Sequence, residues 1–440
     1  MAHEIGLGRN VSETPEEPSA AQSYCCYPAE LKMAVTNGMS IAGNKFEGFK
    51  CNATDAIEFK LVRHEPDIFD DSKVFHPDMT HQLESIFGYK DLKVQIYCSA
   101  ARMITYVNVA YSAKIDPEQY DGVKADDILG LLSKHLQPGF LTNRDAFISQ
   151  LTKDKTFKPF GELVHSYTTT REDKQLEFEV YKTDIEAIGF RDFHERIQPF
   201  LLFFVDAASY IDVDDDRWDY YLLFEKYREA GTTIYAFAGY MTVYNYYAYP
   251  EKIRPRISQV LVMPPFQRQG HGATLIQTFY NSCYNRHDIL DITVEDPSEN
   301  FQRVRDFVDC KNCMRLPSFQ PEELHQGFSE KMRLETREKL FINRKQARRI
   351  YEILRLRATN MANKEQQRGY RLDIKKRLNS PFQKNGRDFQ KLKRALEPTE
   401  LAATLNNLSV EQRMEYLEKH YEEVITEYRA VIERLATNVD

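Results

Sequence analysis

The stretch that decides the fold is ISQVLVMPPFQRQGHGATLI, residues 257–276. A β-rich run reaches Pro264 and Pro265, which stop the strand because proline cannot donate a ladder hydrogen bond. Gly270 and Gly272 follow, and they let the backbone approach a ligand with no Cβ in the way. The amphipathic pattern that begins there would aim free N–H groups and the positive end of the helix dipole at one point. The stretch therefore predicts a strand, a turn and a helix, with an anion site at the turn.

The spacing of this turn separates it from the common phosphate loops. No Gly-Lys-Ser/Thr follows, so it is not a P-loop. The glycines also lack the G-x-G-x-x-G spacing of the dinucleotide-binding fingerprint. The form Gln267-x-x-Gly270-x-Gly272 after a strand resembles the coenzyme A pyrophosphate loop of the GNAT acetyltransferase superfamily. The resemblance implies an α/β protein with a GNAT mixed-sheet acetyltransferase core and acetyl-CoA as cosubstrate.

The same resemblance implies which positions contact the cosubstrate. In the superfamily, the strand before the turn offers backbone groups to the pantetheine arm and to the acetyl carbonyl. We expect His271 to form local hydrogen bonds rather than to transfer protons. The implied contacts are Val260, Leu261, Val262, Gln267, Arg268, Gln269, Gly270, His271, Gly272, Ala273 and Ser298.

The chain around this unit divides by pattern. Strand-like alternation at 56–62, 92–97 and 104–111, with helical stretches near 125–136 and 144–153, predicts a first α+β domain. A strand at 288–295 and a helix at 297–308 are expected after the cofactor helix, and the pattern beyond 320 is helical. The expected segments are a disordered leader at 1–48, an N-terminal α+β domain at 49–157, the acetyltransferase core at 158–310, a basic helical region at 311–395 and a heptad helix at 396–440.

Five motifs in order extend the resemblance to a particular family. They are FFVDAASYIDVDDDRW (203–218), GYMTVYNYY (239–247), the turn itself, DITVEDPS (291–298) and ARRIYEILRL (347–356), and together they resemble the type B histone acetyltransferases. The similarity spans about residues 52–380. It implies a lysine N-acetyltransferase that acts by direct attack in a ternary complex on N-terminal-tail lysines of newly synthesised, soluble histone H4. It also implies a WD40-type histone chaperone subunit as a partner.

Three carboxylates are candidates for the proton chemistry. Only a neutral amine is a nucleophile, so a base must first deprotonate the lysine ammonium, and a carboxylate in a partly desolvated cleft can do so. Glu295 ends a strand whose end should face the ligand crevice, and Asp296 is a good N-cap before Pro297. The resemblance implies a general base at Glu295 and an assisting or alternative base at Asp296. It places a third carboxylate at Asp206, where the family usually has Glu, and the shorter side chain favours electrostatic or water-mediated help.

Acidic and aromatic side chains near these carboxylates suit a Lys/Arg-rich, Gly-rich peptide. Carboxylates select positive charge, and aromatic walls pack a lysine stem. The structural alternative is a solvated acidic loop beside core tyrosines. The resemblance implies that the histone tail contacts Tyr244, Asn245, Tyr246, Trp218 and, from the first domain, Glu84.

The formal net charge of −7 is unevenly distributed, because residues 331–400 carry 21 basic and 8 acidic side chains. The total argues against a dedicated nucleic-acid binder, and the basic stretch suits docking on an acidic surface, a partner or nuclear import. No signal-peptide or membrane-spanning run is visible. We therefore expect a protein of nucleus and cytoplasm with no membrane and no direct nucleic-acid contact. We expect no metal, because Cys310 and Cys313 have only the pair at 25–26 as a possible second half of a zinc site.

The end of the chain carries a heptad repeat. Its spacing alternates between four and three residues, as in the a/d positions of a coiled coil, and it lasts little more than three heptads. We expect docking on the protein's own surface or on a partner helix rather than self-dimerisation. The repeat consists of Val410, Met414, Leu417, Tyr421, Val424, Tyr428, Val431 and Leu435.

Two other functions fit part of this pattern. An acetyltransferase for another amine or protein would share the turn and the acidic groove, and turnover on spermidine against a histone tail peptide separates the two. A non-catalytic histone-binding scaffold would keep the fold. Glu295 and the complete loop at 267–273 argue against the scaffold.

Overall fold

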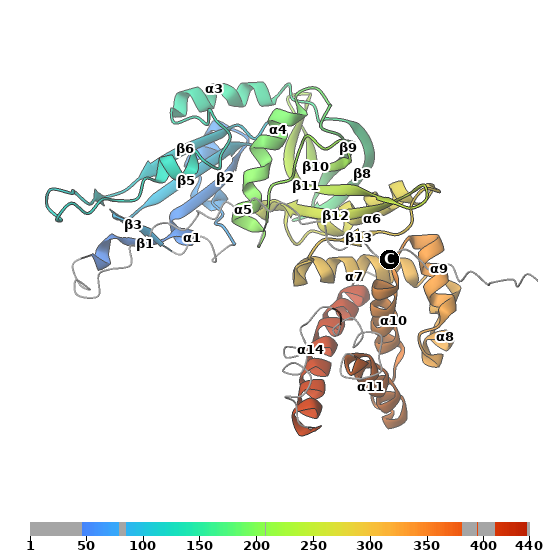
Figure 1. Cartoon of the computed structure of the whole chain (residues 1–440). Coiled ribbons are helices and arrows are strands. Elements are labelled where there is room, and N and C mark those ends of the chain that lie inside the picture. Colours follow the sequence, from blue (N-terminus) through green and yellow to red (C-terminus); the bar gives the residue numbers. More distant parts are fainter. Residues whose placement is uncertain (1–45, 79–84, 207, 381–393, 395–409, 438–440) are drawn as a thin grey trace, which may run out of the picture.

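The computed structural model describes residues 46–78, 85–206, 208–380, 394 and 410–437. The expected leader at 1–48 therefore lies almost wholly outside the described residues. Figure 1 shows three parts in chain order: a small α+β part, a central curled sheet with helices, and a helical part beneath the sheet. One large hydrophobic core cluster includes residues of all three parts, and a second, smaller cluster lies within the first part.

The central sheet has six strands in the order β13-β12-β11-β10-β9-β8. Neighbouring strands are antiparallel except β12 and β13, which are parallel. Long β-branched and aromatic runs favour these strands because such side chains fit a pleated surface. The strands are β8 (Glu162–Arg171), β9 (Lys174–Thr183), β10 (Trp218–Glu229), β11 (Thr232–Ala248), β12 (Lys252–Val262) and β13 (Thr293–Val294).

The strand expected at 288–295 is much shorter in the structure. Only Thr293–Val294 forms β13, and the residues before it divide their backbone hydrogen bonds between two neighbours. Leu290 N donates to Ile253 O over 2.9 Å, whereas Ile292 N donates to Phe341 O over 2.8 Å. A segment that changes partner in this way cannot form one continuous ladder.

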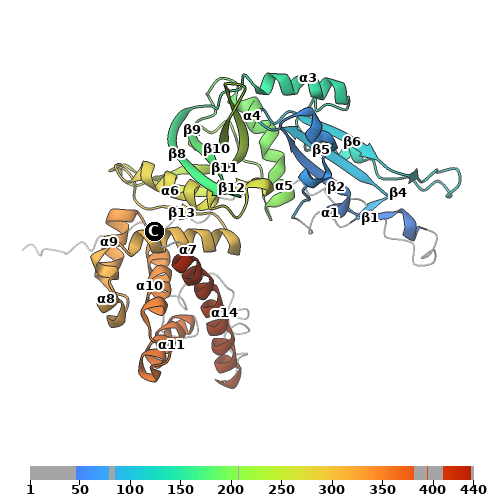
Figure 2. The ribbon, with the colours of Figure 1, turned by 180° about the vertical axis from the view of Figure 1, so that it is seen from behind.

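Helices cover both faces of the sheet (Figure 2). Successive residues of a strand point to opposite faces, and two tyrosines of β10 show which helix lies on each. Tyr220 contacts Phe190 of α4 (Phe190–Ile197) at a ring-centroid distance of 4.9 Å. Tyr221 contacts α6 (His271–Cys283), where its hydroxyl lies 2.9 Å from Ser282 Oγ. The short α5 (Leu201–Phe204) follows α4 along the chain.

The first part packs against the sheet through its own small sheet. The parallel pair β2 (Ile57–Val62) and β5 (Lys93–Ser99) and the antiparallel β6 (Thr105–Ala110) confirm three expected strands. The helix expected near 125–136 is only α2 (Ile128–Leu132), because Asp127 caps it. The remaining elements are β1 (Lys50–Asn52), α1 (Ala53–Ala56), β3 (Ser85–Phe87), β4 (Tyr89–Lys90), β7 (Ala113–Lys114) and α3 (Arg144–Asp154).

The C-terminal part is helical throughout its described residues, as expected. It begins with α7, which spans Glu299–Cys313 rather than 297–308. None of the helices in the described residues is long and apolar enough to cross a membrane. The other helices are α8 (Pro321–Gln326), α9 (Glu330–Leu340), α10 (Arg344–Ala358), α11 (Lys364–Leu378) and α14 (Val410–Thr437).

The heptad helix docks inside the molecule, which confirms one of the two expected modes. α14 packs against α7, α10 and α11 (Figure 1). Tyr421, Tyr428 and Leu435 of the repeat are buried, whereas Met414 at its start is 67% exposed. The amphipathic stripe of α14 therefore serves the protein's own core over its last four turns.

Candidate acetyl transfer site

The turn before α6 has the geometry of an anion site. Gly270 has φ +91°, in the left-handed region, and forms the N-cap of α6 without any side-chain cap. A Cβ at Gly270 would meet nothing within 4 Å, so the surface above this residue is open. The first N–H groups of a helix have no partner within the helix. The backbone of 271–273 can therefore donate to an anion at this turn.

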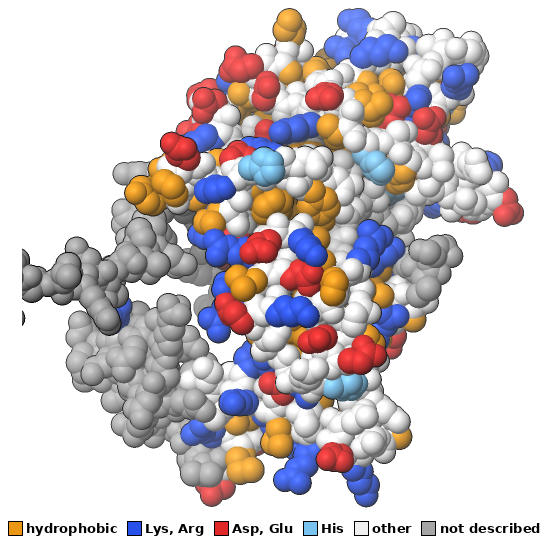
Figure 3. Space-filling view, turned by 90° about the vertical axis from the view of Figure 1, so that its right-hand side faces the viewer, with side chains coloured by type: hydrophobic (Ala, Val, Ile, Leu, Met, Phe, Trp, Pro, Cys, Tyr) orange, Lys and Arg blue, Asp and Glu red, His pale blue; other side chains and the backbone are white. Residues whose placement is uncertain are grey.

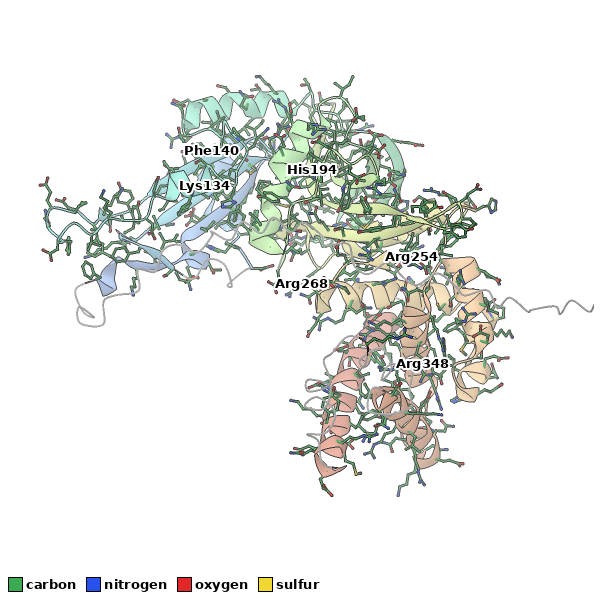
Figure 4. The ribbon with its side chains drawn as sticks, in the orientation of Figure 1. Lys134, Phe140, His194, Arg254, Arg268 and Arg348 are labelled. Atoms are coloured by element: carbon green, nitrogen blue, oxygen red, sulfur yellow. The ribbon has the colours of Figure 1, made fainter. Side chains whose placement is uncertain are left out.

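Two glutamines of the motif brace the loop. Gln267 Nε2 donates to Val262 O over 2.9 Å, and Gln269 Nε2 donates to Pro265 O over 3.2 Å. Between them, Arg268 has φ +60° and is exposed. In Figure 4, Arg268 and Arg254 lie toward opposite ends of β12, and Arg268 is at the end near the turn. The glutamine side chains thus hold the backbone in shape, while Arg268 is the basic side chain available to a ligand.

His271 turns away from the ligand surface. Its side chain is buried, with 1% of its surface exposed, and its Nδ1 lies 2.6 Å from the hydroxyl of Tyr167. Its ring packs against Phe178 at a centroid distance of 4.2 Å. Burial lowers the pKa of His271 to about 4, so the ring is neutral at physiological pH. Only the backbone of His271 can contact an anion at the turn. The sequence provided no signal for its partner Tyr167.

The strand before the turn has one edge without a neighbour. β12 pairs with β13 only at Arg256 and Ile257, and no strand in the described residues pairs with this edge beyond them. On the other edge, Met263 N donates to Ala238 O over 2.9 Å. Because ladder bonds alternate along a strand, the N–H groups of Val260 and Val262 point to the open edge. They are available to a bound acyl group.

β12 has an irregularity at the point where it separates from β13. The register with β11 shifts between Met241 and Val243, and Gln259 N donates to the hydroxyl of Thr242 over 3.1 Å. The buried Gln259 side chain donates to Ser209 O over 2.7 Å. The bulge therefore ties the loop after α5 to the centre of the site. The sequence does not announce this contact.

Glu295 lies beside this bulge. Its N–H donates to Ile257 O over 2.9 Å, which continues the β12–β13 pairing by one residue. Its carboxylate Oε2 accepts a hydrogen bond from Ser258 Oγ over 2.9 Å. The side chain is exposed, so it can be reached by a substrate. Ser258 was expected only as part of the strand, and its role as the partner of Glu295 is a finding of the structure.

Asp296 is not the N-cap of α7, contrary to expectation. Ser298 fills that position, and its Oγ accepts from Phe301 N over 3.2 Å. Asp296 instead has φ +29°, a backbone region that Asp tolerates better than most residues. Two residues therefore separate Asp296 from the helix start, and Pro297 lies before the cap rather than after it. The hydroxyl of Ser298, an implied cofactor contact, is occupied by this capping bond.

Two further carboxylates were expected near the site, Asp206 as a third candidate for the proton chemistry and Glu84 as a tail contact. Asp206 follows α5 and is exposed. It lies three residues before Ser209, whose carbonyl is bound to Gln259 of β12, so the structure brings its segment to the same bulge. Glu84 lies outside the described residues.

Aromatic side chains line the face next to Glu295. Cross-strand partners share a face, and Trp218 pairs with Tyr244, which pairs with Arg256. The rings of Trp218 and Tyr244 lie 4.8 Å apart, and those of Tyr244 and Tyr246 lie 4.5 Å apart, both edge to face. These three expected tail-binding side chains therefore form one continuous aromatic wall, whereas Asn245 alternates to the opposite face of β11.

Charged side chains organise this wall. Arg217 stacks over the ring of Tyr244 at 4.8 Å and donates to Asp215 over 2.6 Å. The hydroxyl of Tyr244 donates to the same carboxylate over 2.8 Å, and these bonds, that of Arg217 foremost, lower the pKa of Asp215. Asn245, the fourth expected residue, donates to Asp219 over 3.0 Å. The acidic run around Arg217 was a signal in the sequence, but nothing in the sequence pointed to Arg217 itself.

The residues present suit a coenzyme A thioester. An open cavity of about 480 Å³ lies beside the turn, and the side chains that line it include Arg171 and Arg268. The uncapped helix start and these cations suit phosphates, while the open edge of β12 suits a thioester carbonyl. In the described residues there is no cluster of side chains that could hold a metal ion. Cys310 and Cys313 are fully buried in α7, and burial raises the pKa of each thiol well above its usual value.

A mixed sheet that opens between two parallel strands, with a glycine turn and helix at the opening, defines an acetyltransferase of the GNAT type. Comparison with known proteins identifies the family. Residues 49–206 match the model for the histone acetyl transferase HAT1 N-terminus. Residues 305–356 match that for the histone acetyltransferase type B catalytic subunit, C-terminal.

Whole-chain relatives agree with these matches. The mouse histone acetyltransferase type B catalytic subunit is 47% identical over 414 residues, which cover 93% of this chain and 99% of the mouse protein. The human protein of the same name is 47% identical and covers 90% of this chain and 96% of its own length. A Dictyostelium discoideum relative is 34% identical over 72% of this chain and 70% of its own length. The chain belongs to the family of histone acetyltransferase type B catalytic subunits, and it is a histone acetyltransferase.

Proposed function

We propose that the protein transfers acetyl from acetyl-CoA to N-terminal-tail lysines of newly synthesised, soluble histone H4, by direct attack in a ternary complex. The observation that carries the proposal is the position of Glu295. Its carboxylate accepts a hydrogen bond from Ser258 Oγ, at the point where β12 and β13 separate. It thus has the open edge of β12 on one side and the acidic, aromatic wall on the other.

Glu295 acts as the general base in this proposal. It takes a proton from the lysine ammonium, directly or through one water, and the neutral amine attacks the thioester carbonyl. The hydrogen bond from Ser258 fixes one carboxylate oxygen, which leaves Oε1 to face the substrate. Asp206, on the segment tied to Gln259, supplies negative charge from the other side of the bulge. Asp296 assists or replaces Glu295 as base.

The open edge of β12 stabilises the charge that develops on the carbonyl oxygen. The N–H groups of Val260 and Val262 are held rigidly by the ladder with β11, so they need no reorganisation during the reaction. The displaced coenzyme A thiolate takes up a proton on leaving. The backbone N–H groups of 271–273 and the cation of Arg268 hold the pyrophosphate.

The tail substrate lies along the wall of Trp218, Tyr244 and Tyr246. Asp212, Asp214 and Asp216 are exposed beside this wall, and they select a peptide rich in positive charge. The aromatic rings pack the aliphatic stem of the target lysine. The wall is built from the ends of two neighbouring strands, β10 and β11, with the acidic loop before β10 beside it, and this open arrangement supports a basic, flexible peptide better than a folded surface.

The remaining parts of the proposal rest on the family resemblance. We propose a WD40-type histone chaperone subunit as partner, and nucleus and cytoplasm as locations. Co-purification of a tagged protein and fluorescence imaging test these two points. A preparation without any such subunit, or a signal confined to another compartment, would contradict them.

One experiment tests the function itself. The protein is incubated with labelled acetyl-CoA and mixed core histones, and the modified lysines are mapped by mass spectrometry. We expect label on tail lysines of H4. Spermidine in a parallel reaction serves as a competing amine, and faster turnover on spermidine would refute a histone substrate.

A further inference from the structure

The strand that carries Glu295 is too short to fix its own position. β13 has two residues and two partners in β12, Arg256 and Ile257. One further backbone bond, from Glu295 N to Ile257 O, extends this pairing. A two-residue edge strand is only marginally stable on such contacts. Contacts from outside the sheet must therefore help to hold the Glu295 carboxylate at Ser258.

The helical part of the chain supplies contacts on the opposite side. Ile292, just before β13, donates its N–H to Phe341 O over 2.8 Å and forms a parallel bridge with Ile342. Phe341 has φ +55° and ends α9. A bulky residue in the left-handed region is strained and persists only where its surroundings enforce it. This strained residue is the one that presents its carbonyl to the catalytic strand.

The carbonyl of Ile292 is held as well. Arg305 of α7 donates an Nη2 hydrogen bond to it over 3.3 Å. The Arg305 side chain is 5% exposed, and its Nε lies 3.4 Å from Asp309 Oδ2 one turn along the same helix. Both backbone groups of Ile292 are therefore bonded to the C-terminal part, three residues before Glu295.

The ion pair of Arg305 with Asp309 belongs to a polar network that extends through the helical part. Asp309 accepts from Gln346 of α10 over 2.8 Å, and the same amide donates to Asp306 over 3.0 Å. Arg349 of α10 donates to Asp306 over 2.7 Å and to Glu427 of α14 over 2.9 Å. Asp306 and Asp309 are fully buried. A continuous polar network thus runs from the last helix to the strand that bears the base.

We propose that Arg305 is a positioning residue for the acetyl transfer: it links the buried network of the C-terminal helices to Ile292 and so fixes β13 with Glu295 at Ser258. The proposal rests on Glu295 as the base. Arg305 is buried and its contacts are with Ile292 and Asp309, so it acts through the strand and not on the substrate.

Arg305→Lys is the first test, with Arg303→Lys on the same helix as the matched control. Lysine keeps a cation near Asp309, but it lacks the planar guanidinium fork that reaches Asp309 through Nε and the Ile292 carbonyl through Nη2 at once. Arg305→Met combined with Asp309→Asn is the second variant, because it leaves no unpaired buried charge. For each full-length variant we would measure kcat, both KM values, the affinity for acetyl-CoA by calorimetry, and hydrogen exchange of residues 288–296 by mass spectrometry.

We expect faster exchange in 288–296 and a fall in kcat of about tenfold or more, with both KM values and the acetyl-CoA affinity within about twofold of the wild type. Unchanged exchange would overturn the proposal. Faster exchange with unchanged kcat would also overturn it. The exchange result does not depend on the identity of the base, whereas failure of Glu295 as base would appear as wild-type kcat in Glu295→Gln, so the two failures are distinguishable.

Discussion

At the scale of single residues, the site combines an exposed candidate base with buried neutral groups. Glu295 can meet a substrate because its side chain is exposed, and Ser258 restrains it by one hydrogen bond. His271 and His194 are buried close to the sheet, and burial lowers the pKa of each to about 4. Both rings therefore pack as neutral side chains at physiological pH.

Replacing Glu295 by Gln should lower kcat by about tenfold or more, because an amide cannot accept the lysine proton. The affinity for acetyl-CoA should not change, since the cosubstrate contacts lie on the turn and on β12. Steady-state kinetics on a tail peptide and calorimetry check both points. Glu299→Gln, an exposed carboxylate four residues further along, is the control. Near-wild-type turnover in Glu295→Gln would remove it from the mechanism.

His194 predicts a pH dependence of stability. Its pKa is about 4 in the folded protein, first because of burial and then because of Arg191, against about 6.5 in an unfolded chain. Below about pH 6.5 the unfolded state binds the extra proton, so stability falls as the pH drops toward 4, by up to ~3 kcal/mol from this residue. Urea unfolding of the wild type and of His194→Phe at pH 7.5 and 5.0 measures the contribution.

We expect the wild type to lose more stability between these two pH values than His194→Phe does. The exposed His325 provides the control, because His325→Asn should lose as much stability as the wild type. Equal losses in the wild type and in His194→Phe would contradict the assignment.

At the scale of elements, the turn at 264–270 and its helix could be predicted from the sequence, because prolines, glycines and the amphipathic pattern act locally. The start of α7 could not. Asp296 and Ser298 are both good caps, and the choice between them depends on where β13 ends. That end is set by the pairing with β12, where Glu295 N makes the last backbone hydrogen bond, to Ile257 O, far away in the chain.

Gly270→Asp tests the turn. A side chain at this position enters open space and meets no neighbour, so the cost is the backbone strain of a positive φ, about 1–2 kcal/mol, but the added carboxylate repels the pyrophosphate. We expect a folded protein that no longer binds acetyl-CoA, as measured by calorimetry. Gly139→Asp is a control, because Gly139 also has a positive φ, of +92°, and open space around its Cβ. Unchanged acetyl-CoA binding by Gly270→Asp would refute the turn as the anion site.

At the scale of the whole molecule, basic side chains of residues 331–400 form ion pairs with acidic side chains of the same chain. Glu352 is fully buried and accepts from Arg348 and Arg377, and Glu418 of α14 receives Arg371 and Lys375. The face of the helical part in Figure 3 shows basic and acidic side chains interspersed. Part of the positive charge of the stretch is therefore paired with acidic side chains outside it: Arg371 and Lys375 with Glu418, and Arg349 with Asp306 and Glu427.

Tyr428→Phe tests how firmly α14 belongs to the fold. The hydroxyl of Tyr428 donates to Glu352 over 2.9 Å in the buried network. Its loss should lower the free energy of unfolding by about 1–3 kcal/mol, because a buried carboxylate loses a partner. Chemical denaturation measures the change, with the exposed Tyr111→Phe as control. A stability equal to that of the wild type would mean that α14 contributes little to the fold.

The sequence by itself determined the strand-turn-helix unit, the order of the parts, the candidate base and the amphipathic last helix. The unit and the last helix follow from local rules of periodicity and chain stiffness, whereas the order of the parts and the candidate base rest on the resemblance of several motifs to one family. Only the tertiary structure decided that Ser258 hydrogen-bonds to Glu295, that His271 turns toward Tyr167, and that Arg305 and Phe341 hydrogen-bond to Ile292, just before β13. Each of these contacts joins segments far apart in the chain, so its energy depends on packing and burial that no local pattern records.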